Sequence, residues 1–193
     1  MSVSKRIEQK GIFMKQQRLF KKGIIGLVCS IILIVIDQLA KAAAVTHLRG
    51  QESLVLWDGV FELRYLENHG AAFGLLQNQR TFFIISTVIL LILLVYLYLK
   101  RIPDERRYQW LNVIIVLYIA GAVGNFIDRL LNEYVIDFFY FVLIDFPIFN
   151  IADIYVVVST GLLLVLGFFF YKEEDFERIF PSKKKKNSDT AEQ

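Results

Sequence analysis

Four long runs of apolar residues constrain this chain more than any other feature of its sequence. They cover residues 23–44, 82–99, 110–127 and 154–171, and the last three contain no charged side chain. An α-helix rises 1.5 Å per residue, so roughly 20 apolar residues cross a hydrocarbon core about 30 Å thick. The mean hydropathy of +0.48 also argues against an ordinary soluble domain. We therefore predict an all-α membrane protein built on a four-transmembrane-helix bundle.

The distribution of basic residues predicts how the bundle is oriented. Seven lysines and arginines precede the first apolar run, four separate the second run from the third, and six follow the fourth. Cytoplasmic segments of membrane proteins are enriched in these residues, so we expect both termini in the cytoplasm. We divide the chain into a basic extension (1–22), a four-helix membrane domain (23–171) and a charged tail (172–193). The extension and the lysine run at 183–186 are expected to contact anionic lipid.

We expect two further segments to lie on the opposite, outer face. In the first, Asp58-Gly59 is flanked by alternating apolar and polar residues, which indicates a β-hairpin and predicts a small extracytoplasmic β element. The second, 135–149, is apolar but holds Asp137, Asp145 and Pro147. Its longest uninterrupted apolar run is too short to cross a membrane. We expect it at the interface or packed on the bundle, in either a helical or an extended conformation.

Two groups of polar residues lie within an apolar run or directly at its end, and a carboxylate at a helix centre costs about 2.5–3.5 kcal/mol. Asp37 and Lys41 are four residues apart and share a helix face. They form either an ion pair that eases insertion, with Lys41 extending outward, or a support for a functional site. At the end of the third run, Asn125, Asp128 and Arg129 share a face, which fits either a structural cluster or a site.

Further polar residues lie at the outer ends of the runs. Asp137 is either a solvated acid or a functional one, and Asp153 is either a helix-capping residue or a functional one, with Asn150 three residues before it. Asn68 and Gly70 fit a plain turn or a loop that another chain approaches closely. By contrast, we expect Asp145, in a loop beside a proline, to be solvated.

The residue types exclude most catalytic chemistries. The sequence has no GxSxG, HExxH or P-loop motif. Its single cysteine excludes an intrachain disulfide, and its two histidines are too few and too isolated for a histidine zinc site. A net charge of +3 gives no support for nucleic-acid binding. Two carboxylates brought together can share one proton, so that one activates water while the other polarises a peptide carbonyl. This acid chemistry requires no metal and no cofactor.

Two other functions use the same residue types. A carboxylate-dependent membrane transporter or proton channel would place its acids along a path through the bilayer, whereas here the acids gather at one face. A scaffold without catalytic activity would explain helix packing but not the convergence of acids and amides on one side.

Five motifs in order resemble those of bacterial lipoprotein signal peptidase, also called signal peptidase II. They are D-Q-L-A-K (37–41), N-H-G-A-A-F-G (68–74), G-A-V-G-N-F-I-D-R (121–129), V-I-D-F (135–138) and F-N-I-A-D (149–153). The resemblance implies an intramembrane aspartyl endopeptidase in the bacterial cytoplasmic (inner) membrane, with its site near the outer face. It would remove the signal peptide of a prolipoprotein just before a cysteine that carries diacylglycerol.

The resemblance also assigns roles to residues. Asp137 and Asp153 match the catalytic pair. Site support or substrate contact is implied for eight further residues: Asp37, Lys41, Asn68, Gly70, Asn125, Asp128, Arg129 and Asn150. The implied partners are the diacylglyceryl-modified prolipoprotein and membrane lipid, and cyclic peptide inhibitors of the family are expected to occupy the site.

Overall fold

A computed structural model describes residues 3–70 and 76–181 of the chain. The element order, given with the bounds of each element, is α1 (Val3–Leu48), β1 (Leu54–Trp57), β2 (Phe61–Asn68), α2 (Arg80–Tyr96), a π-helical turn (Leu97–Arg101), a 3-10 turn (Arg106–Tyr108), α3 (Gln109–Leu131), β3 (Val135–Phe141), a second 3-10 turn (Val142–Ile144), α4 (Ile151–Phe169) and α5 (Glu173–Ile179).

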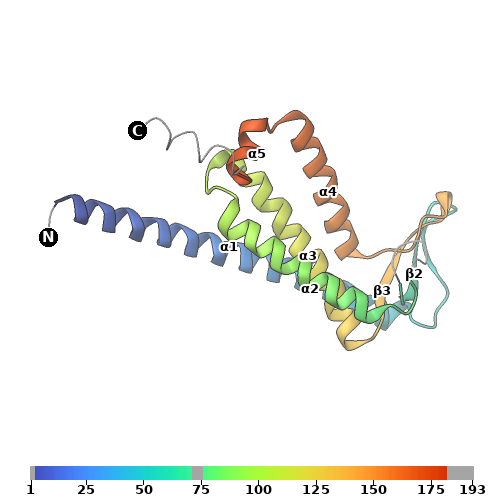
Figure 1. Cartoon of the computed structure of the whole chain (residues 1–193). Coiled ribbons are helices and arrows are strands. Elements are labelled where there is room, and N and C mark those ends of the chain that lie inside the picture. The colour runs from blue at the N-terminus through green and yellow to red at the C-terminus, as the bar shows by residue number, and fades with distance from the viewer. Residues whose placement is uncertain (1–2, 71–75, 182–193) are drawn as a thin grey trace.

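Within these residues, four helical stretches are long and apolar enough to cross a membrane, which confirms the predicted bundle. They are Gln9–Leu48, Arg80–Arg101, Arg106–Leu131 and Ile151–Phe169. The first helix is longer than its apolar run, because the basic segment before residue 23 continues it. Its 46 residues correspond to about 69 Å. Its N-terminal part therefore extends beyond the other helices (Figure 1).

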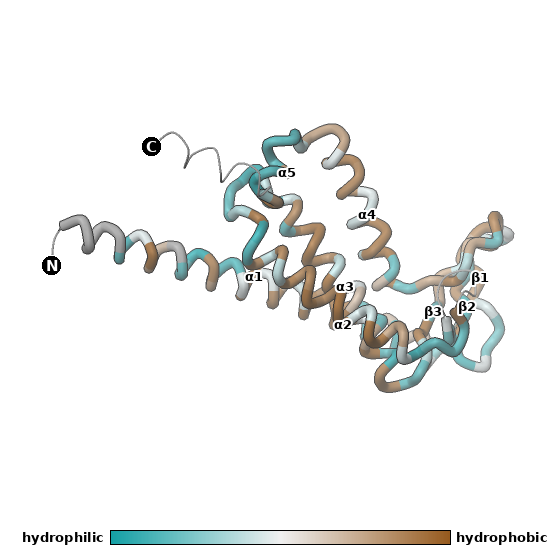
Figure 2. Tube along the Cα trace, viewed as in Figure 1, coloured by the Kyte–Doolittle hydropathy of each residue, from teal (hydrophilic) through white to brown (hydrophobic). Residues whose placement is uncertain are grey.

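The helix α3 is the centre of the bundle, since it packs against α1, α2 and α4. Small residues make this packing close, and Ala120 is completely buried. A methyl group added to Gly124 would lie 2.5 Å from an oxygen of Asp37, and one added to Gly121 would lie 2.6 Å from the carbonyl oxygen of Ala152. The membrane-length helices consist mainly of apolar residues, as Figure 2 shows. Many of their large apolar side chains are exposed, which suits contact with lipid chains.

A small antiparallel sheet with the order β1-β2-β3 lies beyond the C-terminal end of α3 (Figure 1). The predicted hairpin at Asp58-Gly59 is confirmed, because β1 and β2 pair directly across this turn. The positive φ of 67° at Gly59 is a conformation that glycine adopts readily. The strand β3 adds to β2, so the first half of the segment 135–149 is extended rather than helical.

The chain after β3 turns back on itself, and this return positions the start of α4. The backbone N–H of Phe139 donates to the carbonyl oxygen of Phe149 at 2.8 Å, and the reverse bond measures 3.0 Å. The two residues form an isolated antiparallel bridge. Asp137 and residues 150–153 therefore lie side by side, next to the Phe139–Phe149 bridge, although they are separated in the sequence.

Candidate active site

The carboxyl group of Asp137 lies on β3, almost completely buried, with 1% of the residue exposed. Asn68 on β2 is paired with Val135, two residues before Asp137, so the three side chains share one face of the sheet. The Asn68 amide donates to Oδ2 of Asp137 at 2.9 Å, and the Asn150 amide donates to Oδ1 at 2.7 Å.

The environment of Asp137 favours its protonated form. Burial raises the pKa of Asp137 to about 7, and the negative charge of Asp153 adds to the shift. The amides of Asn68 and Asn150 and the charge of Lys41 act in the opposite direction. Asp137 is therefore a carboxyl group that can hold a proton near neutral pH.

The second acid, Asp153, is the third residue of α4 and belongs to its N-terminal cap. Its oxygen Oδ2 accepts the backbone N–H of Asn150 at 3.1 Å, while its own N–H donates to Oδ1 of Asn150 at 3.0 Å. Its other oxygen, Oδ1, accepts the Asn125 amide at 2.8 Å. Capping and site interpretations of Asp153 are therefore compatible, because capping fixes the orientation of its carboxylate.

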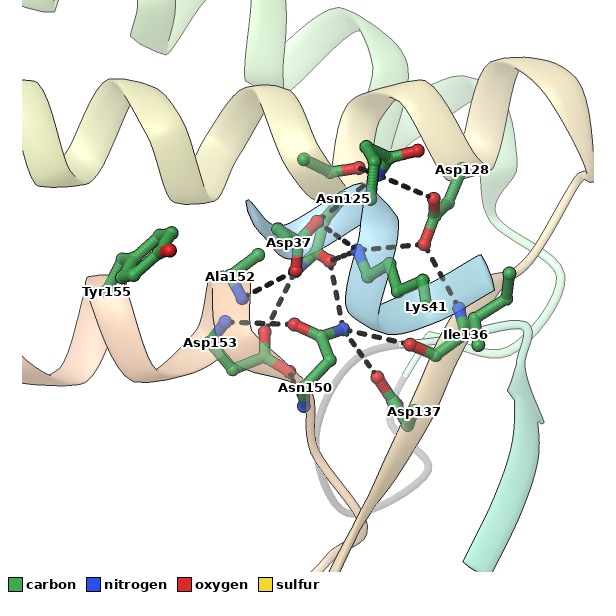
Figure 3. A network of polar contacts seen from close by, with 12 residues as sticks. Asp37, Lys41, Asn125, Asp128, Ile136, Asp137, Asn150, Ala152, Asp153 and Tyr155 are labelled. Carbon is green, nitrogen blue, oxygen red and sulfur yellow. Dashed lines mark hydrogen bonds and ion pairs between the residues drawn. The ribbon is translucent and has the colours of Figure 1, made fainter. Parts of the chain in front are cut away.

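The side chain of Asn150 joins the two acids, as Figure 3 shows. It is completely buried. Besides its bond to Asp137, its Nδ2 group contacts Oδ1 of Asn125 at 3.0 Å and the carbonyl oxygen of Ile136 at 3.3 Å. A single amide thus bonds to Asp137 and caps the helix that presents Asp153.

Behind this pair lies a buried ion cluster of Asp37, Lys41 and Asp128. The Lys41 ammonium lies 2.9 Å from a carboxylate oxygen of each acid. The interpretation in which Lys41 extends outward is wrong, since 1% of the residue is exposed and two buried carboxylates attract its charge. Asp128 pairs with Lys41, not with its neighbour Arg129, among the ion pairs of the described chain.

Further bonds connect the ion cluster to the candidate catalytic pair. Lys41 donates to Oδ1 of Asn125 at 2.9 Å, and Asn125 in turn donates to Asp153. Asp37 accepts the backbone N–H of Ala152, next to Asp153, at 2.9 Å. Asp128 accepts the backbone N–H of Ile136, next to Asp137, at 3.1 Å. The cluster thus contacts both chain segments that carry the two acids.

A cavity of about 580 Å³ opens onto the pair. Its polar lining consists of residues identified from the sequence: Asn68, Gly70, Asn125, Arg129, Asp137 and Asp153. The remaining wall is mainly apolar: Val135, Phe141, Ile144, Phe146, Pro147, Ile148, Phe149, Ile154, Val156, Val157 and Val158. The cavity therefore combines two carboxyl groups with a surface suited to hydrocarbon chains.

Gly70, which follows β2, lines this cavity. Its carbonyl oxygen accepts a bond from Nη2 of Arg129 at 3.1 Å, and its N–H donates to Oδ1 of Asn68 at 2.9 Å. The rest of the N-H-G-A-A-F-G motif, residues 71–74, lies outside the described residues. Asp145 is exposed, as predicted for a solvated acid, and accepts the hydroxyl of Tyr140 at 2.6 Å.

Sequence reasoning missed Gln38, which belongs to the polar network. Its amide donates to Oδ2 of Asp37 at 3.2 Å, to Oδ1 of Asp128 at 3.1 Å and to the carbonyl oxygen of Gly124 at 3.2 Å. A polar amide within an apolar run was a usable signal.

Comparison with known proteins identifies the family. A model of signal peptidase (SPase) II matches residues 29–169. Lipoprotein signal peptidases of Streptococcus pyogenes serotype M1 and serotype M5 (strain Manfredo) are 41% and 40% identical over 146 residues, covering 76% of this chain and 92% of each relative.

Two solved structures of bacterial membrane enzymes, determined by the in meso method at 2.3 and 1.9 Å resolution, are also similar. They are 33% and 34% identical, with TM-scores of 0.65 and 0.66. The matches cover 77% and 76% of this chain and 92% and 94% of the solved chains. The chain therefore belongs to the signal peptidase II family, aspartic peptidases that remove signal peptides from prolipoproteins.

Proposed function

We propose that Asp137 and Asp153 are the catalytic pair of this peptidase. The observation that carries the proposal is that both carboxylates border one cavity and are tied to the same residue, Asn150. The raised pKa of Asp137 supports it, because an aspartic peptidase requires one protonated and one ionised carboxyl group.

In this mechanism, the ionised carboxylate takes a proton from water while the water oxygen bonds to the carbonyl carbon of the scissile peptide. The protonated carboxyl group donates its proton to the carbonyl oxygen. When the C–N bond breaks, the first carboxyl group passes its proton to the leaving amine. The second carboxyl group recovers its proton from a hydroxyl group of the tetrahedral intermediate as that intermediate collapses to the carboxylic acid. The pair thus returns to its starting state.

The substrate is a prolipoprotein whose cysteine carries diacylglycerol, and cleavage occurs just before that cysteine. The apolar wall of the cavity supports this choice, because it continues from Asp153 along α4 through Ile154, Val157 and Val158. Lipid chains can lie against this wall while the peptide reaches the acids. Cyclic peptide inhibitors of the family would occupy the same cavity between Asp137 and Asp153.

We infer from the basic residues that the helix ends opposite the sheet face the cytoplasm and that the sheet and cavity lie at the outer face. The basic extension 1–22 and the tail 172–193 then flank the membrane domain 23–171 on the cytoplasmic side, with membrane lipid as their partner. The lysine run 183–186 lies outside the described residues.

The test uses purified protein and two synthetic prolipoprotein peptides that differ only in the diacylglyceryl group. We expect cleavage of the lipidated peptide and none of the other. Asp137→Asn and Asp153→Asn should each lower the rate at least about 100-fold while the protein stays folded in detergent. The matched control is Asp145→Asn, an exposed acid in the same segment.

Near wild-type cleavage by either catalytic variant would refute the assignment of the pair. Equal cleavage of both peptides would refute the assigned substrate. Ion flux through liposomes in the absence of any cleavage would instead favour the carboxylate-dependent transporter or proton channel.

A further inference from the structure

The first turn of α2 holds the end of α3 that carries Arg129. Arg80 donates from Nε to the carbonyl oxygen of Arg129 at 2.8 Å and from Nη2 to that of Leu130 at 3.0 Å. These are among the last carbonyl groups of α3, for which the helix itself supplies no donor. Arg80 also forms an ion pair with Glu133, just after the helix. The guanidinium thus caps the C-terminus of α3.

About one helical turn after Arg80, Phe83 contacts the Arg129 side chain. The guanidinium carbon of Arg129 lies 4.4 Å from the centroid of the Phe83 ring, a cation–π contact. Residues three apart share a helix face, so Arg80 and Phe83 act from the same side of α2. Arg129 is consequently held twice, by its backbone through Arg80 and by its side chain through Phe83.

The guanidinium held in this way borders the cavity. Its Nη2 donates to the Gly70 carbonyl and its Nη1 to the carbonyl oxygen of Asn125 at 3.4 Å. Gly70 in turn bonds to Asn68, which bonds to Asp137. A continuous series of contacts therefore runs from the Phe83 ring through Arg129, Gly70 and Asn68 to the Asp137 carboxylate.

We propose that Arg80 and Phe83 are positioning residues that hold the Arg129 guanidinium at the cavity, where it binds the Gly70 carbonyl and orients the substrate backbone. The proposal rests on the proposed function of the cavity. An arginine side chain has several rotatable bonds. The two carboxylates that border the same cavity would attract the Arg129 guanidinium to other positions. The ring of Phe83 and the cap by Arg80 restrict it to one orientation, so binding does not have to select that orientation from many.

The principal test is Phe83→Leu, which keeps an apolar side chain and removes the aromatic face. We expect KM for the lipidated peptide to rise roughly 3- to 30-fold, the loss anticipated for a partly desolvated cation–π contact, with kcat changed less than about twofold. Phe83→Trp should restore KM, and Arg80→Gln should raise it. The matched controls are Phe168→Leu, at a 79% exposed position on α4, and Arg64→Gln, on the sheet.

A double-mutant cycle separates positioning from a merely structural role. If Phe83 acts through Arg129, Phe83→Leu should have no further effect on KM in the Arg129→Gln background, which has no cation for the ring to hold. Should Arg129→Gln be too slow for kinetics, the same comparison is made by binding of the lipopeptide to proteins that also carry Asp153→Asn. A structural role would instead give equal effects in both backgrounds, with a matching fall in unfolding temperature.

An unchanged KM in Phe83→Leu and Arg80→Gln, or equal effects in both backgrounds, would overturn the proposal. Failure of the wild-type protein to cleave the lipidated peptide would count against the proposed function itself. The two failures are thus distinguishable, since the first requires an active wild-type enzyme.

Discussion

Asn150 and Asp153 cap each other at the start of α4. Each accepts on its side chain the backbone N–H of the other, at 3.0 and 3.1 Å. This reciprocal cap fixes the Asp153 carboxylate, while the free end of the Asn150 amide reaches Asp137 at 2.7 Å. The relative placement of the two acids therefore depends on one side chain that is itself not acidic.

Substitution of Asn150 can separate its two roles. Serine keeps an oxygen that caps the helix but has no amide to hold Asp137, whereas alanine loses both. We expect both variants to lose most cleavage activity, and Asn150→Ala to be less stable than Asn150→Ser by about 1 kcal/mol. Peptide cleavage and thermal unfolding in detergent provide the two measurements. Cleavage by Asn150→Ser near the wild-type rate would contradict the bridging role.

The raised pKa of Asp137 predicts a pH dependence of stability. Between its unfolded value of 3.8 and its folded value of about 7, the folded protein binds more protons at this group than the unfolded chain. Stability contributed by Asp137 is therefore full below the unfolded value and is lost as pH rises through the folded one. The shift corresponds to roughly 4 kcal/mol at most.

The measurement is thermal unfolding of wild type and Asp137→Asn between pH 4 and pH 8. Asparagine cannot ionise, so the variant should lack this part of the slope and gain stability relative to wild type as pH rises. A stability difference between the two proteins that stays constant across this range would show that Asp137 does not titrate there.

The sequence predicted the membrane spans and the hairpin for simple physical reasons. Long apolar runs have few alternatives to crossing a membrane, and the Asp58-Gly59 pair favours one turn geometry. The strand β3 was not predictable in the same way. Its first four residues are buried, so the run from Val135 lacks the polar alternation of a half-buried strand. Its extended conformation follows from its pairing with β2, a partner far away in the sequence.

The candidate site was predictable as a set of residues but not as a network. Motifs pointed to the acids and amides that border the cavity, because each stands out in an apolar sequence. The motifs do not show where each side chain points, so the sequence could not place the Lys41 ammonium in the interior. Phe83 and Arg80 carry no signal in the sequence, since a phenylalanine in an apolar run and an arginine before it are typical of any membrane helix.

Removal of the Lys41 charge should destabilise the bundle strongly. Lys41→Met would leave Asp37 and Asp128 buried without their cation, and breaking a buried ion pair in this way typically costs about 3–5 kcal/mol. We expect a corresponding fall in unfolding temperature in detergent. A second substitution, Asp37→Asn, should recover part of the loss by removing one uncompensated charge. Stability of Lys41→Met within about 1 kcal/mol of wild type would contradict this account.

The close contact of α3 with its neighbours predicts that its glycines do not tolerate a methyl group. Gly124→Ala would press on the Asp37 carboxylate, and Gly121→Ala on the backbone of Ala152, so both should lower stability and displace groups that support Asp153. Gly161→Ala on α4 is the matched control. Its methyl group would meet no atom within 4 Å, and alanine favours a helix by about 1 kcal/mol over glycine. Unfolding temperature and peptide cleavage are compared for the three variants. Equal stability of Gly124→Ala and Gly161→Ala would mean that α1 and α3 can separate without harm to the site.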